Sequence, residues 1–163
     1  MPDVRVPDLG VPGLDLLLGD GLAELLGSDD VERLRLRVKP GTSAALAVRR
    51  GSTHLLVLAA AGRARAKVAK TAEKAAALDA VAAEDTERGV LATYLPGDRD
   101  LPGVRRLPEG AAVLSYNPQR RLVARIDGND GPRVLRVVRP AAHTAAARGP
   151  RALGGRAGTP RLL

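Results

Sequence analysis

Apolar and charged residues alternate after residue 30, and this period of two predicts β-strands. In residues 33–38 every arginine is followed by a leucine or a valine, as in a strand that turns one face toward a core. A turn is expected at residues 39–41, and further strands at residues 44–48 and 55–58, separated by a turn at residues 50–52. The pattern therefore predicts a small antiparallel meander.

The segment before this meander, residues 1–30, predicts loop and short helix. Its apolar runs at residues 14–18 and 22–26 are short, and glycines follow both of them, Gly19 and Gly27. Glycine directly after an apolar helical run favours the end of the helix. We therefore expect no long helix in this segment.

The strongest helical pattern covers residues 64–87, which are rich in Ala, Lys and Glu and contain neither Gly nor Pro. The expected apolar stripe of this helix consists of Val68, Thr71, Ala75, Leu78 and Val81. Gly89 is expected to end the helical region, residues 90–94 to form a short strand, and residues 95–110 to form a connecting loop.

A second meander is predicted further along the chain. Its strands are expected at residues 113–116, 122–126 and 134–138, with turns at residues 117–119 and 127–131. Pro140 should stop the third strand. A helix could begin within residues 141–147, and residues 148–163 have the composition of a disordered tail.

The two meanders resemble each other. Residues 36–48 and 114–126 align on Pro40 and Pro118, at a spacing of 78 residues. The predicted fold class is therefore α+β, with two small antiparallel β meanders joined by an Ala-rich helix. The expected domain division is a cap-like α+β unit at residues 1–108, the second meander at residues 109–147 and the tail at residues 148–163.

Composition limits the chemistry. The 163 residues include no Cys, Phe or Trp, so thiol nucleophiles and disulfides are excluded and the core must be aliphatic. The net charge is +8, but residues 1–30 hold seven acids and one base, a net of −6, which leaves +14 for the rest. No secretory signal or membrane-length apolar run is visible. We expect a soluble cytoplasmic protein with no membrane partner.

The second meander carries a more specific signal. It contains VLSYNPQRRLVARI at residues 113–126 and GPRVLRV at residues 131–137. These runs resemble the first three strands of aminoglycoside-phosphotransferase-like kinases, in which a Tyr-x-Pro-x-Arg-Arg turn joins strands one and two. The resemblance implies a kinase N-lobe with residues 31–108 as an N-terminal cap. The residues that it assigns to nucleotide binding are Asn117, Gln119, Arg120, Arg121 and Arg136.

The chain also departs from that family. Arg136 stands where the family has a lysine, and Gln119 where a glycine would allow the closest approach to phosphate. The His-Gly-Asp loop and the metal-binding Asn and Asp of the catalytic lobe are absent, and no acidic residue follows Asp130. We therefore expect no catalytic or metal-binding residues in this chain. The family's ATP and Mg²⁺ should not bind tightly.

The sequence is compatible with two functions. One is a truncated or split phosphotransferase, inactive by itself, whose partners are a weakly bound nucleotide and the missing catalytic lobe or a partner chain. The other is a non-catalytic module that uses an Arg-rich surface for a protein or nucleic-acid partner. Nucleic acid is disfavoured because no aromatic residue interleaves with the arginines of the tail.

Several simpler interpretations apply to single residues. The sequence IDGND at residues 126–130 is similar in residue types to a metal-binding kinase segment, but a hairpin turn is the simpler interpretation. His54 and His143 have no partners at ligand spacing. The basic residues of the predicted helix are expected to form a solvated face, and a solvated strand edge is the simpler interpretation of Arg120, Arg121 and Arg136.

Overall fold

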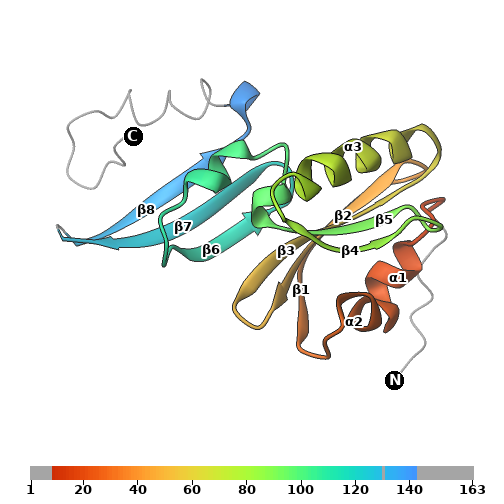
Figure 1. Ribbon diagram of the computed structural model, residues 1–163, viewed down its shortest axis with the longest axis horizontal. Coiled ribbons are helices and arrows are strands. Elements are labelled where there is room, and N and C mark those ends of the chain that lie inside the picture. The colour runs from red at the N-terminus through yellow and green to blue at the C-terminus, as the bar shows by residue number, and fades with distance from the viewer. Residues whose placement is uncertain (1–8, 130, 143–163) are drawn as a thin grey trace. The chain divides into compact units, whose positions relative to one another are not determined.

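The computed structural model describes residues 9–129 and 131–142. The chain divides into two compact units, residues 1–99 and residues 100–163 (Figure 1). Both units are built on antiparallel sheets, and the chain also forms helices, so the predicted α+β fold class is confirmed. The predicted tail at residues 148–163 lies outside the described residues.

The first unit contains a five-stranded antiparallel sheet with the strand order β1-β2-β3-β5-β4. Its first three strands follow one another through tight turns, as the alternating pattern predicted. The strands are β1 (Val31–Lys39), β2 (Ser43–Arg50), β3 (Thr53–Ala60), β4 (Val81–Asp85) and β5 (Val90–Tyr94).

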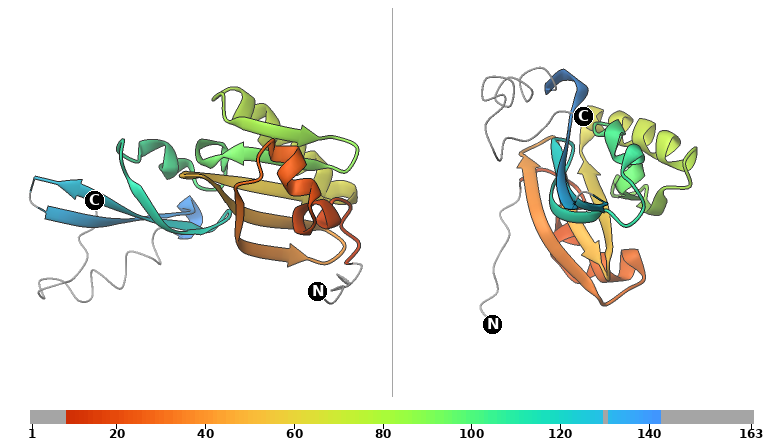
Figure 2. Two further views of the ribbon diagram at one scale, coloured as in Figure 1. Left: turned by 90° about the horizontal axis from the view of Figure 1, so that it is seen from below. Right: turned by 90° about the vertical axis from the view of Figure 1, so that its left-hand side faces the viewer.

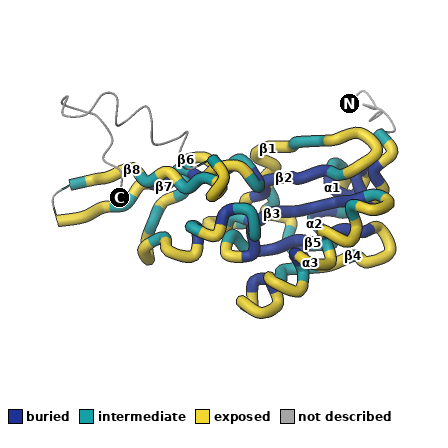
Figure 3. Tube along the Cα trace, turned by 90° about the horizontal axis from the view of Figure 1, so that it is seen from above, coloured by how far each residue is buried: buried dark blue, intermediate teal, exposed yellow. Residues whose placement is uncertain are grey.

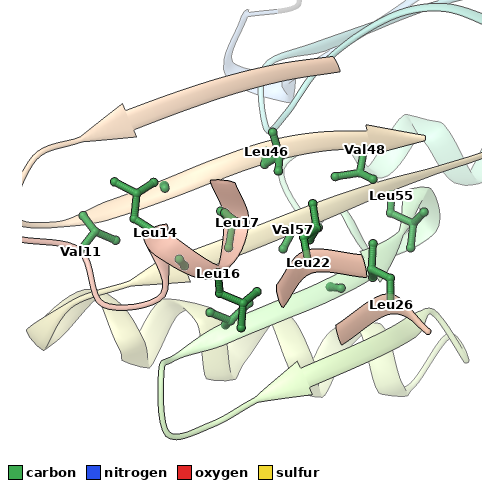
Figure 4. Close-up of a cluster of buried hydrophobic side chains, with 14 residues drawn as sticks. Val11, Leu14, Leu16, Leu17, Leu22, Leu26, Leu46, Val48, Leu55 and Val57 are labelled. Atoms are coloured by element: carbon green, nitrogen blue, oxygen red, sulfur yellow. The ribbon is translucent and has the colours of Figure 1, made fainter. Parts of the chain in front are cut away.

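Two short helices cover one face of this sheet. They are α1 (Leu14–Leu18) and α2 (Gly21–Leu26), and their leucines pack against β2, β3 and β5 (Figure 4). Leu17 and Leu22 are fully buried. Burying one such side chain stabilises the fold by roughly 1.5–3 kcal/mol, which offsets the low intrinsic stability of helices this short.

Two arginines of the sheet tie these helices down. Arg33 on β1 donates hydrogen bonds to the carbonyl oxygens of Leu17, at 2.8 Å, and of Gly19. Arg50 on β2 donates to the carbonyl oxygen of Leu26, at 2.8 Å, and to the Tyr94 hydroxyl, at 2.9 Å. Carbonyls at helix C-termini lack partners inside the helix, and a cation placed there also interacts favourably with the helix dipole.

The opposite face of the sheet carries α3 (Arg65–Ala76), preceded by the 3₁₀ turn η1 (Gly62–Ala64) (Figure 2). Its buried residues are Thr71 and Ala75. The chain packs closely here, since a Cβ on Gly97 would lie 3.1 Å from the Ala75 Cβ. Thr71 and Ala75 both belong to the predicted apolar stripe.

The prediction of a helix over residues 64–87 was wrong in its second half. The helix ends at Ala76, and Val81, expected on its stripe, begins β4 instead. Asp79 adopts a left-handed conformation, with φ 49°, and the Tyr94 amide donates to the Ala80 carbonyl at 2.8 Å. Pairing with β5 satisfies backbone groups along β4, which outweighs the modest helical preference of Ala and Glu.

The second unit contains a three-stranded antiparallel sheet in the order β6-β7-β8. Its strands are β6 (Ala112–Asn117), β7 (Arg121–Gly128) and β8 (Gly131–Val138), which confirms the three predicted strands. The region expected to be a connecting loop forms the short 3₁₀ turns η2 (Leu95–Gly97) in the first unit and η3 (Pro102–Arg106) in the second. The 3₁₀ turn η4 (Pro140–Ala142) follows β8.

The predicted repeat is visible in the bounds of the elements. Adding 78 to the residue numbers of β2 and β3 gives the bounds of β7 and β8, and adding 78 to η1 gives η4. The turns before β2 and β7 match as well, since Gly41 and Gln119 both have positive φ, 66° and 59°. The two units therefore share one backbone plan over three strands and the following turn.

Among the described residues, no helix is long and apolar enough to cross a membrane.

We predict that Gly13→Ala destabilises the first unit far more than Gly27→Ala. Both glycines have positive φ, 82° and 60°. A Cβ on Gly13 would overlap Val90 Cγ2 and lie 3.3 Å from the Arg88 carbonyl oxygen, whereas a Cβ on Gly27 meets nothing within 4 Å. The excess loss for Gly13→Ala should be about 1–3 kcal/mol of unfolding free energy, measured by urea denaturation. Equal losses would contradict this packing.

Candidate phosphate-binding face of the second unit

The turn between β6 and β7 is tight and has a defined shape. The Arg120 amide donates to the Asn117 carbonyl at 3.1 Å, Pro118 is buried, and Gln119 takes the left-handed conformation. A non-glycine residue in this conformation costs roughly 1–2 kcal/mol. In the first unit Gly41 holds the equivalent position without that cost.

The strand register decides which predicted residues come together. Asn117 pairs with Arg121 across the first hairpin, and Arg136 pairs with Val123 across the second. Paired residues and residues two apart share a face of a sheet. Three of the five predicted residues, Asn117, Arg121 and Arg136, therefore lie on one face.

The other face of this sheet faces the core of the unit. Tyr116, Leu122 and Ala124 are buried, and so are Leu101 and Val104 of the preceding segment. By comparison, Arg121 and Arg136 on the other face are exposed, and Figure 3 shows much of β7 and β8 as exposed or intermediate.

The sequence prediction missed Arg125. It lies four residues along β7 from Arg121, opposite Val134, and so shares the open face. Arg121, Arg125 and Arg136 thus surround Val123, since diagonal neighbours on adjacent strands are about 7–8 Å apart. We call the set Asn117, Arg121, Val123, Arg125 and Arg136 the arginine face. Counting in steps of two along the predicted strand would have found Arg125.

The remaining two predicted residues lie at the end of the arginine face, in the turn. Arg120 is exposed, and Gln119 is partly buried. They are close in sequence to Asn117 and Arg121, but the turn does not place them on a sheet face.

The charges of the arginine face are only partly compensated. Arg125 forms an exposed ion pair with Asp127 at 3.5 Å. Arg121 and Arg136 are exposed and make no ion pair with any described residue. A planar guanidinium group can donate two parallel hydrogen bonds to the oxygens of one carboxylate or phosphate. This arrangement can therefore attract an anionic group. Because the groups are exposed, salt will screen the attraction.

No metal site is apparent in the part of the chain that the structure describes. No group of three His, Asp or Glu side chains there could hold a metal ion. The segment that resembled a metal site in letters forms the hairpin between β7 and β8, with Gly128 paired to Gly131; residue 130 lies outside the described residues.

His54 belongs to a polar row in the first unit. It pairs with Arg49, which pairs with Glu32 on the edge strand and forms an ion pair with it. Partial burial lowers the pKa of His54 below 6.5, Arg49 lowers it further, and Glu32 acts in the opposite direction. His143 lies outside the described residues.

Two open depressions in the first unit flank α2. One, of about 650 Å³, is lined by Asp20, Glu24, Asp29 and Arg33, and the other, of about 570 Å³, by Glu24, Glu84 and Glu87 among others. Neither involves a residue that the sequence assigned to a site.

No family model, no curated protein sequence and no solved structure matches this chain. The resemblance to aminoglycoside-phosphotransferase-like kinases therefore rests on the residues of the second meander.

We predict that charge changes beside His54 shift its pKa in opposite directions. Arg49→Met should raise the pKa and Glu32→Gln should lower it, because each removes one electrostatic influence on the imidazolium. The measurement is NMR titration of the His54 ring protons. Shifts of the same sign would contradict the polar row.

Because the folded-state pKa of His54 lies below the unfolded value of 6.5, the stability of the first unit should fall as pH drops through 6.5. His54→Gln should flatten this dependence.

Proposed function

We propose that the second unit binds the phosphate groups of a nucleotide on its arginine face, as part of an aminoglycoside-phosphotransferase-like kinase. The observation that carries the proposal is the grouping of Arg121 and Arg136 beside Asn117 on one open sheet face, next to a tight turn. The resemblance assigned these residues to nucleotide binding from sequence motifs alone. Their position on one face comes from the strand register, which is a separate observation.

The repeat supports a binding role for this face. The positions equivalent to Arg121, Arg125 and Arg136 in the first unit are Ser43, Ala47 and Leu58. Ala47 and Leu58 are buried on the α3 side of their sheet. The same backbone plan thus carries apolar residues where a helix covers it and arginines where the described sheet face is open. The arginines on the open face of the second unit are therefore suited to binding an anion.

Catalysis by this chain is not part of the proposal. Phosphoryl transfer requires carboxylates that hold magnesium and orient the nucleophile. Among the described residues, the carboxylate of Asp127 lies beside the arginine face, and it pairs with Arg125. The metal-binding and catalytic groups would have to come from another segment or a partner chain.

The alternative is a non-catalytic module whose arginine face binds an acidic protein surface. The exposed apolar side chain of Val134, at 62% of its maximal area, is the observation that favours it. An exposed apolar side chain beside the arginines can pack against an apolar group of a protein surface, whereas phosphate groups offer it no partner.

We predict that ATP binds weakly and depends on Arg120, Arg121 and Arg136. A dissociation constant on the order of a millimolar, about 4 kcal/mol, is reasonable for one open face. Replacing all three by Ala should weaken binding by about tenfold or more, and rising salt should weaken the wild-type interaction. NMR titration with ATP measures both effects.

The matched control removes three arginines from other positions of the same unit, Arg106, Arg133 and Arg139, so that net charge falls equally. Arg133 pairs with Ile126 on the opposite face. The control should bind ATP nearly as the wild type does. If both triple variants lost the same amount of ATP affinity, net charge alone would explain the effect. That outcome would refute a site on the arginine face.

We also predict that the purified chain shows no ATP hydrolysis and no sugar phosphorylation above background with Mg²⁺ present. The reason is the lack of acidic residues after Asp130, where the family has its catalytic carboxylates. A coupled assay for ADP release tests this. Turnover that persists through repurification and disappears in Arg136→Ala would refute the prediction.

A further inference from the structure

The first unit has a long basic strand at the edge of its sheet. β1 has nine residues and pairs with β2, and no other described strand pairs with it. Residues 32–36 are exposed, in contrast to the buried centre of β2 (Figure 3). A bulge interrupts the pairing between Arg33 and Arg35, but residues 35–39 pair regularly with β2. Edge strands direct alternate backbone amides and carbonyls away from the sheet.

The two sides of this edge differ in chemistry. Arg35, Arg37 and Lys39 share the face that α3 covers further along the sheet, since they pair with Ala47, Ala45 and Ser43. Leu36 and Val38 share the face of α1 and α2, where Val38 packs against the core and Leu36 is 39% exposed. A strand added beside β1 would meet basic groups on one side and apolar groups on the other.

Some charged side chains of β1 are already engaged within the first unit, and others have no ion pair with a described residue. Arg33 is engaged with carbonyl oxygens of α1, and Glu32 with Arg49. Arg35 and Lys39 make no ion pair with a described residue. The regular part of the edge therefore offers positive charge that carboxylates can neutralise.

A second copy of β1 is a poor occupant of this edge. If two β1 strands paired antiparallel in one continuous sheet, residues on the same face would be opposite each other, which brings arginine or lysine against arginine or lysine. Like charges placed opposite are destabilising. The same charges that disfavour self-pairing favour an acidic strand.

We propose that residues 35–39 of β1 bind an extended acidic segment of a partner protein, which adds as a sixth strand. Its sequence should alternate acidic and apolar residues, with the acids beside Arg35 and Lys39 and the apolar residues beside Leu36 and Val38. Backbone hydrogen bonds supply the pairing, and the alternating side chains supply selectivity.

The test uses the full chain and a fluorescent eight-residue peptide of alternating Glu and Val. Fluorescence anisotropy should show saturable binding that weakens with salt, and hydrogen exchange should slow at β1 amides. A peptide with the same residues in two blocks should bind more weakly. The double variant Arg35→Glu and Lys39→Glu should weaken binding by about tenfold or more. The matched variant Lys67→Glu and Lys70→Glu, on the exposed side of α3, should have little effect.

N-methylation distinguishes strand addition from simple charge attraction. Two further peptides carry N-methyl groups at alternate residues, in one frame or the other. Only one frame blocks the amides that face β1, so one peptide should lose binding and the other should keep it. Equal binding by both, equal effects of the two charge variants, or no binding by any peptide would refute the proposal. So would preferential binding of a single-stranded oligonucleotide, or self-association of the chain that Arg35→Glu abolishes.

Discussion

The central strands of the first unit are apolar on both faces, and the rest of that unit depends on this constraint. Leu46, Val57 and Ala92 point to one side, and Ala47, Leu56 and Leu91 to the other, and all six are buried. A sheet of this kind must be covered twice. The acidic segment before β1 supplies α1 and α2 for one face, and the connection between β3 and β4 supplies α3 for the other. Arg33 and Arg50 then hold the two short helices in place through their carbonyl ends.

The second unit uses the same plan with only one apolar face. The strands equivalent to β2 and β3 have the same lengths and register, and the turn before β7 retains the left-handed residue. Arg125 and Arg136 stand where the first unit has the buried residues Ala47 and Leu58, on the face that α3 covers there. Exposed guanidinium groups remain hydrated and contribute little to stability by themselves. Their grouping on one face is the observation on which the proposed phosphate site rests, and it is also compatible with an acidic protein surface.

Much of the fold could be predicted because strand patterning is local. The alternation in residues 33–38 and the Pro-containing turns identified the strands of both meanders, and the spacing of 78 residues identified the repeat. The exception is the end of the long helical pattern. Residues 81–85 are alanine, valine and acids, which suit a helix locally, yet they form β4. Their partners in β5 are several residues away across a turn. Helix propensity describes single residues and does not include the backbone hydrogen bonds that β4 gains by pairing with β5.

The candidate site divides in the same way. The sequence by itself determined which residues are arginines, that they occur in strands, and that Asn117 to Arg121 span a turn. Only the tertiary structure decided which arginines share a face, that Arg125 joins Arg121 and Arg136, and that Arg33 is engaged with helix carbonyls while Arg35 has no ion pair with a described residue. The physical reason is range: alternation and turn chemistry act over a few neighbouring residues, whereas register and the burial of one face depend on strands and helices distant in sequence.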